Sequence, residues 1–126
     1  MKKMIYTTNA PKPIGQYSQA IRVGNTVYIS GQIALQVTTN ELMIHDIQQE
    51  VIQIFENINA IAKEAGGSLN DIVALTVYLM KLSDVETVNE MITRYFDQPW
   101  PARASVQVAK LPRGANVEIA AVMVLS

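Results

Sequence analysis

The chain has 126 residues, a formal net charge of −1 and 49% hydrophobic residues, which predicts a single domain over residues 1–126 with a sizeable core. It has no cysteine and one histidine, His45, which excludes disulfides, thiol nucleophiles and a histidine-based metal site, so we expect no metal. Residues 1–11 lack the apolar core of a signal peptide, and no run approaches the roughly 20 apolar residues of a membrane span, so we expect a soluble, cytoplasmic protein without a membrane partner.

The N-terminal part of the chain predicts three strands. A short strand is expected near residues 4–7, and two longer ones cover residues 19–23 and 26–30. The dipeptide Gly24-Asn25 between the longer strands is typical of a two-residue hairpin turn. Gly31 follows at the end of the hairpin, where a glycine indicates a bulge or a close approach of the backbone.

The middle of the chain predicts a helix and a buried strand. Apolar side chains recur at three- and four-residue spacing over residues 47–65, which is typical of an amphipathic helix. Asp46 with Gln49 resembles a capping box at its start, and Gly66-Gly67 ends it. Residues 71–80 are apolar at both odd and even positions, so this strand is expected to be central and covered on both faces.

The C-terminal part predicts a second helix and two strands. Ser83 and Glu86 form a capping-box pattern that opens the helix, and Pro99 stops it. The buried face of this helix is expected to comprise Val85, Val88, Ile92, Tyr95 and Phe96. Strands over residues 103–109 and 116–125 follow.

These elements predict an α+β fold with a six-stranded mixed sheet. Two helices can cover only one face of such a sheet. The strands over residues 71–80 and 116–125 are nevertheless apolar on both faces, so the second face needs another cover. The simplest cover is a second copy of the chain, and we therefore expect a homo-oligomer whose sheets pack against each other.

Two charged residues, Arg103 and Glu118, interrupt otherwise apolar strands, where an unpaired ion is costly. A guanidinium is a planar fork suited to a carboxylate or phosphate, and a carboxylate can hold a water molecule or a proton. An ion pair between the two is the competing interpretation. Outside residues 41–97 the chain holds seven basic residues against one carboxylate, so a surface shared by its two flanks should attract small anions.

Other residues with reactive side chains show weaker patterns. Ser105 shares a strand face with Arg103, but it has no visible triad partner. Tyr17 lies in a loop, and Trp100 stands between two prolines, which is typical of packing residues. The residues alone therefore predict an oligomeric α+β domain with a small-anion site.

At these positions the sequence resembles the Rid/YjgF family, specifically the RidA-type enamine/imine deaminases. Residues 9–20 are similar to the N-terminal segment of the family, residues 30–33 to its next motif and residues 87–89 to another. The segment from Pro101-Ala-Arg103 to Val117-Glu-Ile119 is similar to its C-terminal signature. Each motif alone is weak, but the four in order are specific and span nearly the whole chain.

The resemblance implies a trimer with a chorismate-mutase-like fold, in which three sheets form a central barrel and ligand sites lie between subunits. The implied reaction is the hydrolysis, without a cofactor, of enamines and imines such as 2-aminoacrylate and 2-iminopropanoate to 2-keto acids and ammonia. Carried over residue by residue, Arg103 would grip the substrate carboxylate and Glu118 would position the attacking water. The remaining substrate-binding residues implied are Tyr17, Ser30, Gly31, Ser105 and Asn89.

The chain departs from the family pattern at two positions, and two other functions stay open. Many members carry cysteine at Ser105, and a hydroxyl removes thiol reactivity. The usual proline is Gln16 here, so the loop of Tyr17 is expected to be less rigid. The alternative function is a regulator that binds keto acids or similar carboxylates and acts through a partner enzyme. Ribonuclease or translation inhibition has also been attached to the family, but the chain has no basic patch, so we expect no nucleic-acid partner.

Overall fold

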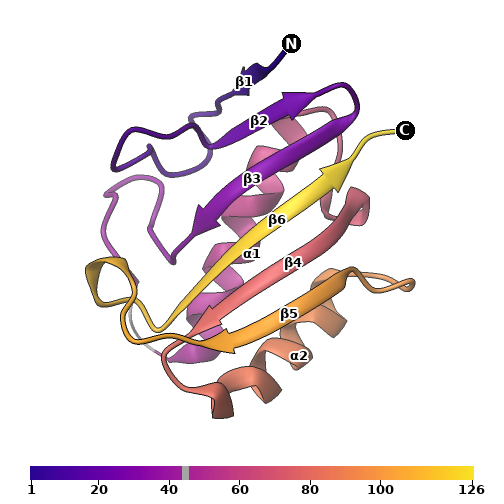
Figure 1. The fold of residues 1–126 in the computed structure, drawn as a ribbon. Helices are drawn as coiled ribbons and strands as arrows, with labels where there is room; N and C mark the ends of the chain where they lie inside the picture. Colours follow the sequence, from indigo (N-terminus) through magenta and orange to yellow (C-terminus); the bar gives the residue numbers. More distant parts are fainter. Residues whose placement is uncertain (44–45) are drawn as a thin grey trace.

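The computed structural model describes residues 1–43 and 46–126, and His45 lies outside the described residues. In this part of the chain, six strands form one sheet and two α-helices pack on it (Figure 1). The strands are β1 (Lys3–Ile5), β2 (Ala20–Val23), β3 (Thr26–Gln32), β4 (Ile72–Leu79), β5 (Ala102–Gln107) and β6 (Val117–Val124), and the helices are α1 (Ile47–Glu64) and α2 (Val85–Tyr95). The predicted α+β class is confirmed.

The sheet is mixed, as predicted. Its strands follow the order β1-β2-β3-β6-β4-β5. β4 and β5 are parallel, and the other neighbouring pairs are antiparallel. The last strand of the chain, β6, therefore lies in the middle, between the N-terminal hairpin and the part that carries α2 (Figure 1). The hairpin turns at Gly24, whose φ of 60° is a left-handed conformation that glycine adopts readily.

Both helices cover the same face of the sheet (Figure 1). Alternate residues of the two central strands point to the helices and are buried: Leu75, Val77 and Leu79 on β4, and Val117, Ile119, Ala121 and Met123 on β6. Phe55 of α1 is fully buried, with ring centroids 5.5 Å from Tyr95 and 5.2 Å from Phe96. The prediction that the helices occupy one face is confirmed.

The opposite face of the sheet is largely apolar at its centre, and no helix of the described residues lies on it. It presents Tyr28 of β3, Ala74 and Thr76 of β4, and Ala120 and Val122 of β6, which line a shallow hollow. Tyr28 keeps 54% of its surface exposed, although its neighbours along the sheet are apolar. We call this surface the open face. A contiguous apolar surface of this kind is typical of an interaction site.

The two helices begin in different ways, and one predicted cap is wrong. The carboxylate of Asp46 accepts a hydrogen bond from the main-chain N–H of Gln49 at 2.8 Å, as predicted for α1. The cap of α2 is instead Asp84, which makes no side-chain bond. Residues 82–84 form a 3-10 turn before this helix, so Ser83 lies inside that turn and cannot cap the helix.

None of the helices in the described part of the chain is long and apolar enough to cross a membrane.

The predicted buried face of α2 is correct in part. Val88, Ile92 and Phe96 are buried, whereas Val85 and Tyr95 are only partly so. Met91 is fully buried and was not expected there. The apolar stripe of α2 is therefore turned slightly from the one that the sequence predicts.

Candidate functional site

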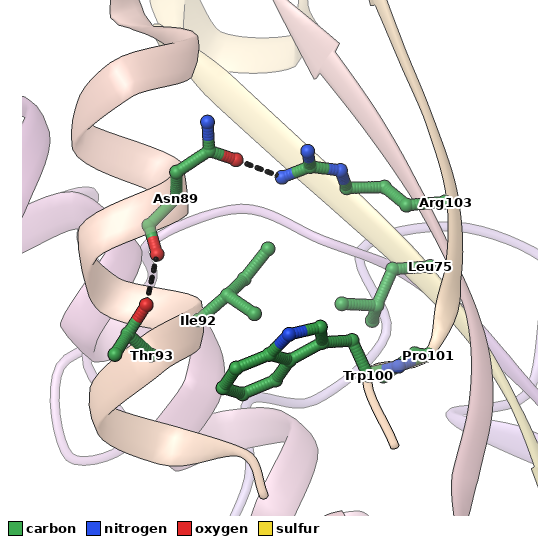
Figure 2. A pocket seen from close by; sticks show the side chains of 7 residues that line it. All are labelled: Leu75, Asn89, Ile92, Thr93, Trp100, Pro101 and Arg103. Atoms are coloured by element: carbon green, nitrogen blue, oxygen red, sulfur yellow. Dashed lines mark hydrogen bonds between the residues drawn. The ribbon is translucent and has the colours of Figure 1, made fainter. Parts of the chain in front are cut away.

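Arg103 projects from the edge strand β5 toward α2. It stands opposite Leu75 of β4, whose side chain points to the helices, so Arg103 lies on the same side of the sheet. Its Nη1 donates a hydrogen bond to Oδ1 of Asn89 on α2 (Figure 2). The main-chain oxygen of Asn89 accepts in turn from the hydroxyl of Thr93 at 3.0 Å. Asn89 thus holds one edge of the guanidinium, and the Arg103 side chain remains exposed at the sheet edge.

A hollow of about 350 Å³ lies beside Arg103, and we call it the arginine hollow. Figure 2 shows that Leu75, Ile92 and Trp100 form an apolar wall next to the guanidinium. The hollow is completed by Asn89, Thr93, Pro101 and Arg103. Trp100, predicted as a packing residue, is 46% exposed and lines this hollow. A cationic fork with an apolar wall suits a small organic anion.

A second hollow, of about 310 Å³, lies beside Glu118 of β6. It is lined by Ile14, Tyr17, Ser30, Gly31, Pro112 and Glu118, and we call it the glutamate hollow. The phenolic oxygen of Tyr17 accepts from the N–H of Ile14 at 3.1 Å, which closes the loop on itself. The hydroxyl of Ser30 donates to the carbonyl of Ser18 at 2.6 Å. Four of the residues that the family resemblance brings together therefore meet here.

Gly31 and Glu118 are in close contact across the pair β3–β6. The register of this pair shifts between Ile29 and Gln32, which is the bulge expected at Gly31. A Cβ atom on Gly31 would collide with the carboxylate of Glu118. The absence of a side chain at this position therefore leaves the space that the Glu118 carboxylate occupies.

Glu118 is a partly buried carboxylate on a central strand. Burial raises its pKa above the usual value of a glutamate, because the ionised form loses hydration. A carboxyl group whose pKa is moved toward neutrality is better suited to accept and return protons near pH 7. The glutamate hollow therefore contains a carboxyl group whose ionised form is disfavoured by burial.

Arg103 and Glu118 lie on opposite faces of the sheet. Glu118 pairs with Tyr78 on the open face, whereas Arg103 pairs with Leu75 on the helix face. The competing interpretation of these residues as an ion pair within the chain is therefore wrong. The structure instead places Asn89 with Arg103 in one hollow, and Tyr17, Ser30 and Gly31 with Glu118 in the other.

Ser105 belongs to neither hollow. It stands opposite the buried Val77, on the same face as Arg103, as the strand alternation predicts. Its Oγ is buried and contacts no hydrogen-bonding partner within residues 1–43 and 46–126. The hydroxyl therefore has no base beside it that could activate it as a nucleophile.

The sequence did not predict the other lining residues. Ile14 and Pro112 border the glutamate hollow, and Leu75 and Ile92 border the arginine hollow. Apolar residues of this kind carry no chemical signal, and their role depends only on where the fold places them. Trp100 lies directly before the Pro-Ala-Arg segment, but nothing in the sequence indicated that it lines the hollow beside Arg103.

Residues 7–125 match the family described as Endoribonuclease L-PSP, the Rid/YjgF group. The chain belongs to this family. It is 45% identical over 124 residues to the mouse protein named 2-iminobutanoate/2-iminopropanoate deaminase, covering 98% of this chain and 92% of the mouse protein. The crystal structure of RidA from an Antarctic Psychrobacter species has a TM-score of 0.94 at 48% identity, covering 98% of this chain and 99% of RidA.

A third relative, TdcF of E. coli, was solved with bound serine. It is 39% identical to this chain with a TM-score of 0.92, and the match covers 98% of this chain and 99% of TdcF. The fold of this Rid-family chain is therefore shared along nearly its whole length with both solved relatives.

Asn89→Asp should weaken the binding of small carboxylates to the Rid-family chain. The new carboxylate would pair with Arg103 and compete with the ligand, so affinity should fall at least about tenfold, the scale of one charge-assisted hydrogen bond. Titration calorimetry with a 2-keto acid such as pyruvate measures the change. Asn89→Ala, which removes the hydrogen bond to Arg103 without adding charge, is the control and should lose less. Equal losses in the two variants would contradict the electrostatic explanation.

Gly31→Ala should displace the Glu118 side chain without unfolding the protein. The added methyl group meets the flexible end of Glu118 rather than backbone, so the carboxylate can move outward into water. Its pKa should then fall toward the ordinary value, because its burial is reduced. Carbon-13 NMR titration of the carboxyl group measures this shift, and Glu118→Gln assigns the resonance. An unchanged pKa in a folded Gly31→Ala protein would show that the contact does not set the position of Glu118.

Proposed function

We propose that this protein hydrolyses 2-imino acids and their enamine tautomers, such as 2-iminopropanoate and 2-aminoacrylate, to 2-keto acids and ammonia. The observation that carries the proposal is 45% identity, over 98% of the chain, to a protein named as such a deaminase. The two hollows support it, because they supply a fork for the substrate carboxylate and a carboxylate of raised pKa for the water. The reaction needs no cofactor and no metal.

We further propose that the active site forms between subunits of a homotrimer with the chorismate-mutase-like fold. Arg103 and Glu118 face away from each other in one chain, so one small substrate cannot reach both there. The open face is apolar and would be covered if three sheets closed a central barrel. The arginine hollow of one subunit would then complete the glutamate hollow of the next.

In the proposed mechanism, Arg103 binds the substrate carboxylate in a bidentate manner while Asn89 holds the remaining edge of the fork. This fixes C2, the adjacent carbon, at a defined position. An enamine first takes up a proton from water at C3 and becomes the iminium ion. Binding by TdcF of serine, whose carboxylate is also attached to a nitrogen-bearing carbon, is consistent with such a site.

Glu118 then accepts a proton from a water molecule as the water oxygen bonds to C2 and the C=N electron pair moves to nitrogen. The carboxyl group passes this proton to the amine nitrogen of the adduct. The C–N bond breaks as the hydroxyl oxygen forms the keto group, which releases ammonia and one proton. Tyr17, Ser30 and the main chain of Gly31 border the reacting atoms, and Ser105, which has no base beside it, takes no part in the chemistry.

The alternative function, a keto-acid-binding regulator that acts through a partner enzyme, is not favoured by the names of the relatives. Such a protein would need Arg103 for binding but would have no use for a carboxylate of raised pKa in the second hollow. Binding of a 2-keto acid without faster imine clearance would support it. An amino-acid oxidase that generates the imine in the assay distinguishes the two functions.

Glu118→Gln should lower the protein-dependent rate of imine clearance at least about tenfold while carboxylate binding is kept. The amide replaces an anionic acceptor by a weaker one and cannot take the proton from water. Because burial raises the pKa of Glu118, the wild-type rate should fall with decreasing pH at a higher pH than an ordinary carboxyl group would cause. This acid limb should be absent in the variant.

Thermal unfolding is the control for this variant. A glutamate whose pKa is raised by burial stabilises the fold most at low pH, and this contribution is lost as the pH rises through the folded-state pKa. At neutral pH, Glu118→Gln should therefore not lower the melting temperature. Wild-type clearance by the variant would remove Glu118 from the mechanism.

Mixed trimers test whether the site lies between subunits. Arg103→Ala and Glu118→Gln should each be inactive, but each mixed trimer would contain one interface with both native side chains. Random refolding of equal amounts should restore about a quarter of wild-type clearance, because about three quarters of the trimers are mixed and one site in three is intact. Each variant refolded alone is the control. No recovery in trimers that are shown to be mixed would place the two residues in different sites.

A further inference from the structure

A buried carboxylate, Glu50, lies in the first half of α1 and meets Asn116 directly before β6. Its Oε2 accepts the main-chain N–H of Asn116 at 3.2 Å, and its Oε1 accepts the side-chain amide of the same residue. We propose that Glu50 is a positioning residue for Glu118, which it holds in the glutamate hollow through Asn116. The catalytic consequence rests on the proposed function, but the structural part of the proposal does not.

Burial of the Glu50 carboxylate costs free energy, because its ionised form loses hydration, unless hydrogen bonds compensate. It has no exposed surface and lies among core residues of α1 such as Val51 and Ile54. A buried carboxylate needs a hydrogen bond to each oxygen, and Asn116 supplies both. The first turn of α1, with its positive end of the helix dipole, also favours an acid. All the donors that the structure gives to this carboxylate thus come from one residue.

Asn116 is held on a second side by β4. Its carbonyl oxygen accepts the N–H of Met80 at 3.0 Å. Val117 follows as a fully buried residue opposite Leu79, and Glu118 is next, opposite Tyr78. Two hydrogen bonds to Glu50 and one to Met80 therefore fix the position of Asn116. They thereby set where β6 begins and how the Glu118 side chain is oriented.

The same segment carries the opposite wall of the glutamate hollow. Pro112 lines the hollow, and its carbonyl accepts the N–H of the buried Ala115 at 3.1 Å. Arg113 donates from Nη1 to the carbonyl of Asn40 at 3.1 Å. Asn116 and Val117 connect this loop to Glu118. A displacement of Asn116 would therefore move both walls of the hollow.

The Glu118 carboxylate depends on this support because no hydrogen bond within the described ranges orients it directly. Its position follows from the start of β6 on one side and from the space above Gly31 on the other. Arg103, by contrast, has Asn89 as its own partner. We infer that the fixed start of β6 orients Glu118 in place of a direct hydrogen-bonding partner.

An exchange of donor and acceptor tests the proposal. Asn116→Asp places two carboxylates against each other, and only the main-chain bond to Glu50 can remain. Adding Glu50→Gln restores a complementary pair, because the new amide can donate to the new carboxylate while its oxygen accepts the main-chain N–H. Val51→Ala, a neighbouring truncation in the core without a polar link to β6, is the control for lost stability.

Two readouts separate positioning from stability. The pKa of Glu118, followed by carbon-13 NMR, should fall toward the ordinary value in Asn116→Asp and return in the double variant. The kcat for imine clearance should fall at least about tenfold in Asn116→Asp, with KM changed less than kcat, and recover to within about threefold in the double variant. Val51→Ala should lose stability while both readouts stay at wild-type values, measured well below its melting temperature.

Opposite results would overturn the proposal. A folded Asn116→Asp protein with an unchanged Glu118 pKa would show that Glu50 only stabilises the fold. If this variant does not fold, Asn116→Ala, which removes one of the two bonds to Glu50, is compared in the same way, and an unchanged pKa there has the same meaning. Absence of clearance by the wild-type protein would refute the proposed function instead, and the NMR comparison would still decide the role of Glu50.

Discussion

The alternation of side chains across β4, β5 and β6 is the constraint on which the rest of this structure depends. Because both helices pack on one face, each strand residue points either into the core or toward the open face. Arg103 follows the parity of Leu75, and Glu118 follows that of Tyr78. Arg103 therefore lies on the helix face but at the exposed edge of the sheet, whereas Glu118 lies on the open face. In the proposed trimer, this separation makes an interface between subunits the only place where they act on one substrate.

The free-energy cost of placing a charge within a sheet is reduced in a different way in each hollow. Arg103 stands on an edge strand, where its long side chain reaches water and needs only Asn89 to hold one edge of the fork. Glu118 stands on a central strand and loses hydration, so its pKa rises. The bulge at Gly31 gives its carboxylate room on the open face. In the proposed mechanism, the group that exchanges protons is thus placed where ionisation is costly, and the group that binds the substrate carboxylate is placed where it stays charged.

The parts of the fold that could be predicted from the sequence depend on local signals. The period of α1, its cap at Asp46, the hairpin turn at Gly24 and the bulge at Gly31 each follow from neighbouring residues. The cap of α2 could not be predicted, because a 3-10 turn precedes this helix and takes up Ser83. The motifs of the family implied which residues form the site. The alternation of side chains within β5 and within β6 does not show whether Arg103 and Glu118 share a face, because β4 lies between the two strands. The division of the site into two hollows therefore required the strand register.

The contacts of buried polar residues could not be predicted from the sequence for a related reason. Glu50 lies on the apolar side of α1, and its partner Asn116 is 66 residues away along the chain. Its spacing from Ile47 and Ile54 places Glu50 on the apolar side of α1, but no local pattern indicates which residue pairs with it. The structure shows it holding the start of β6, while Asn89 holds the arginine on the other side of the sheet. Each half of the proposed site is therefore prepared within its own chain. In the proposed trimer, assembly would only bring these two halves together, so the residues that shape the site would differ from those that join the subunits.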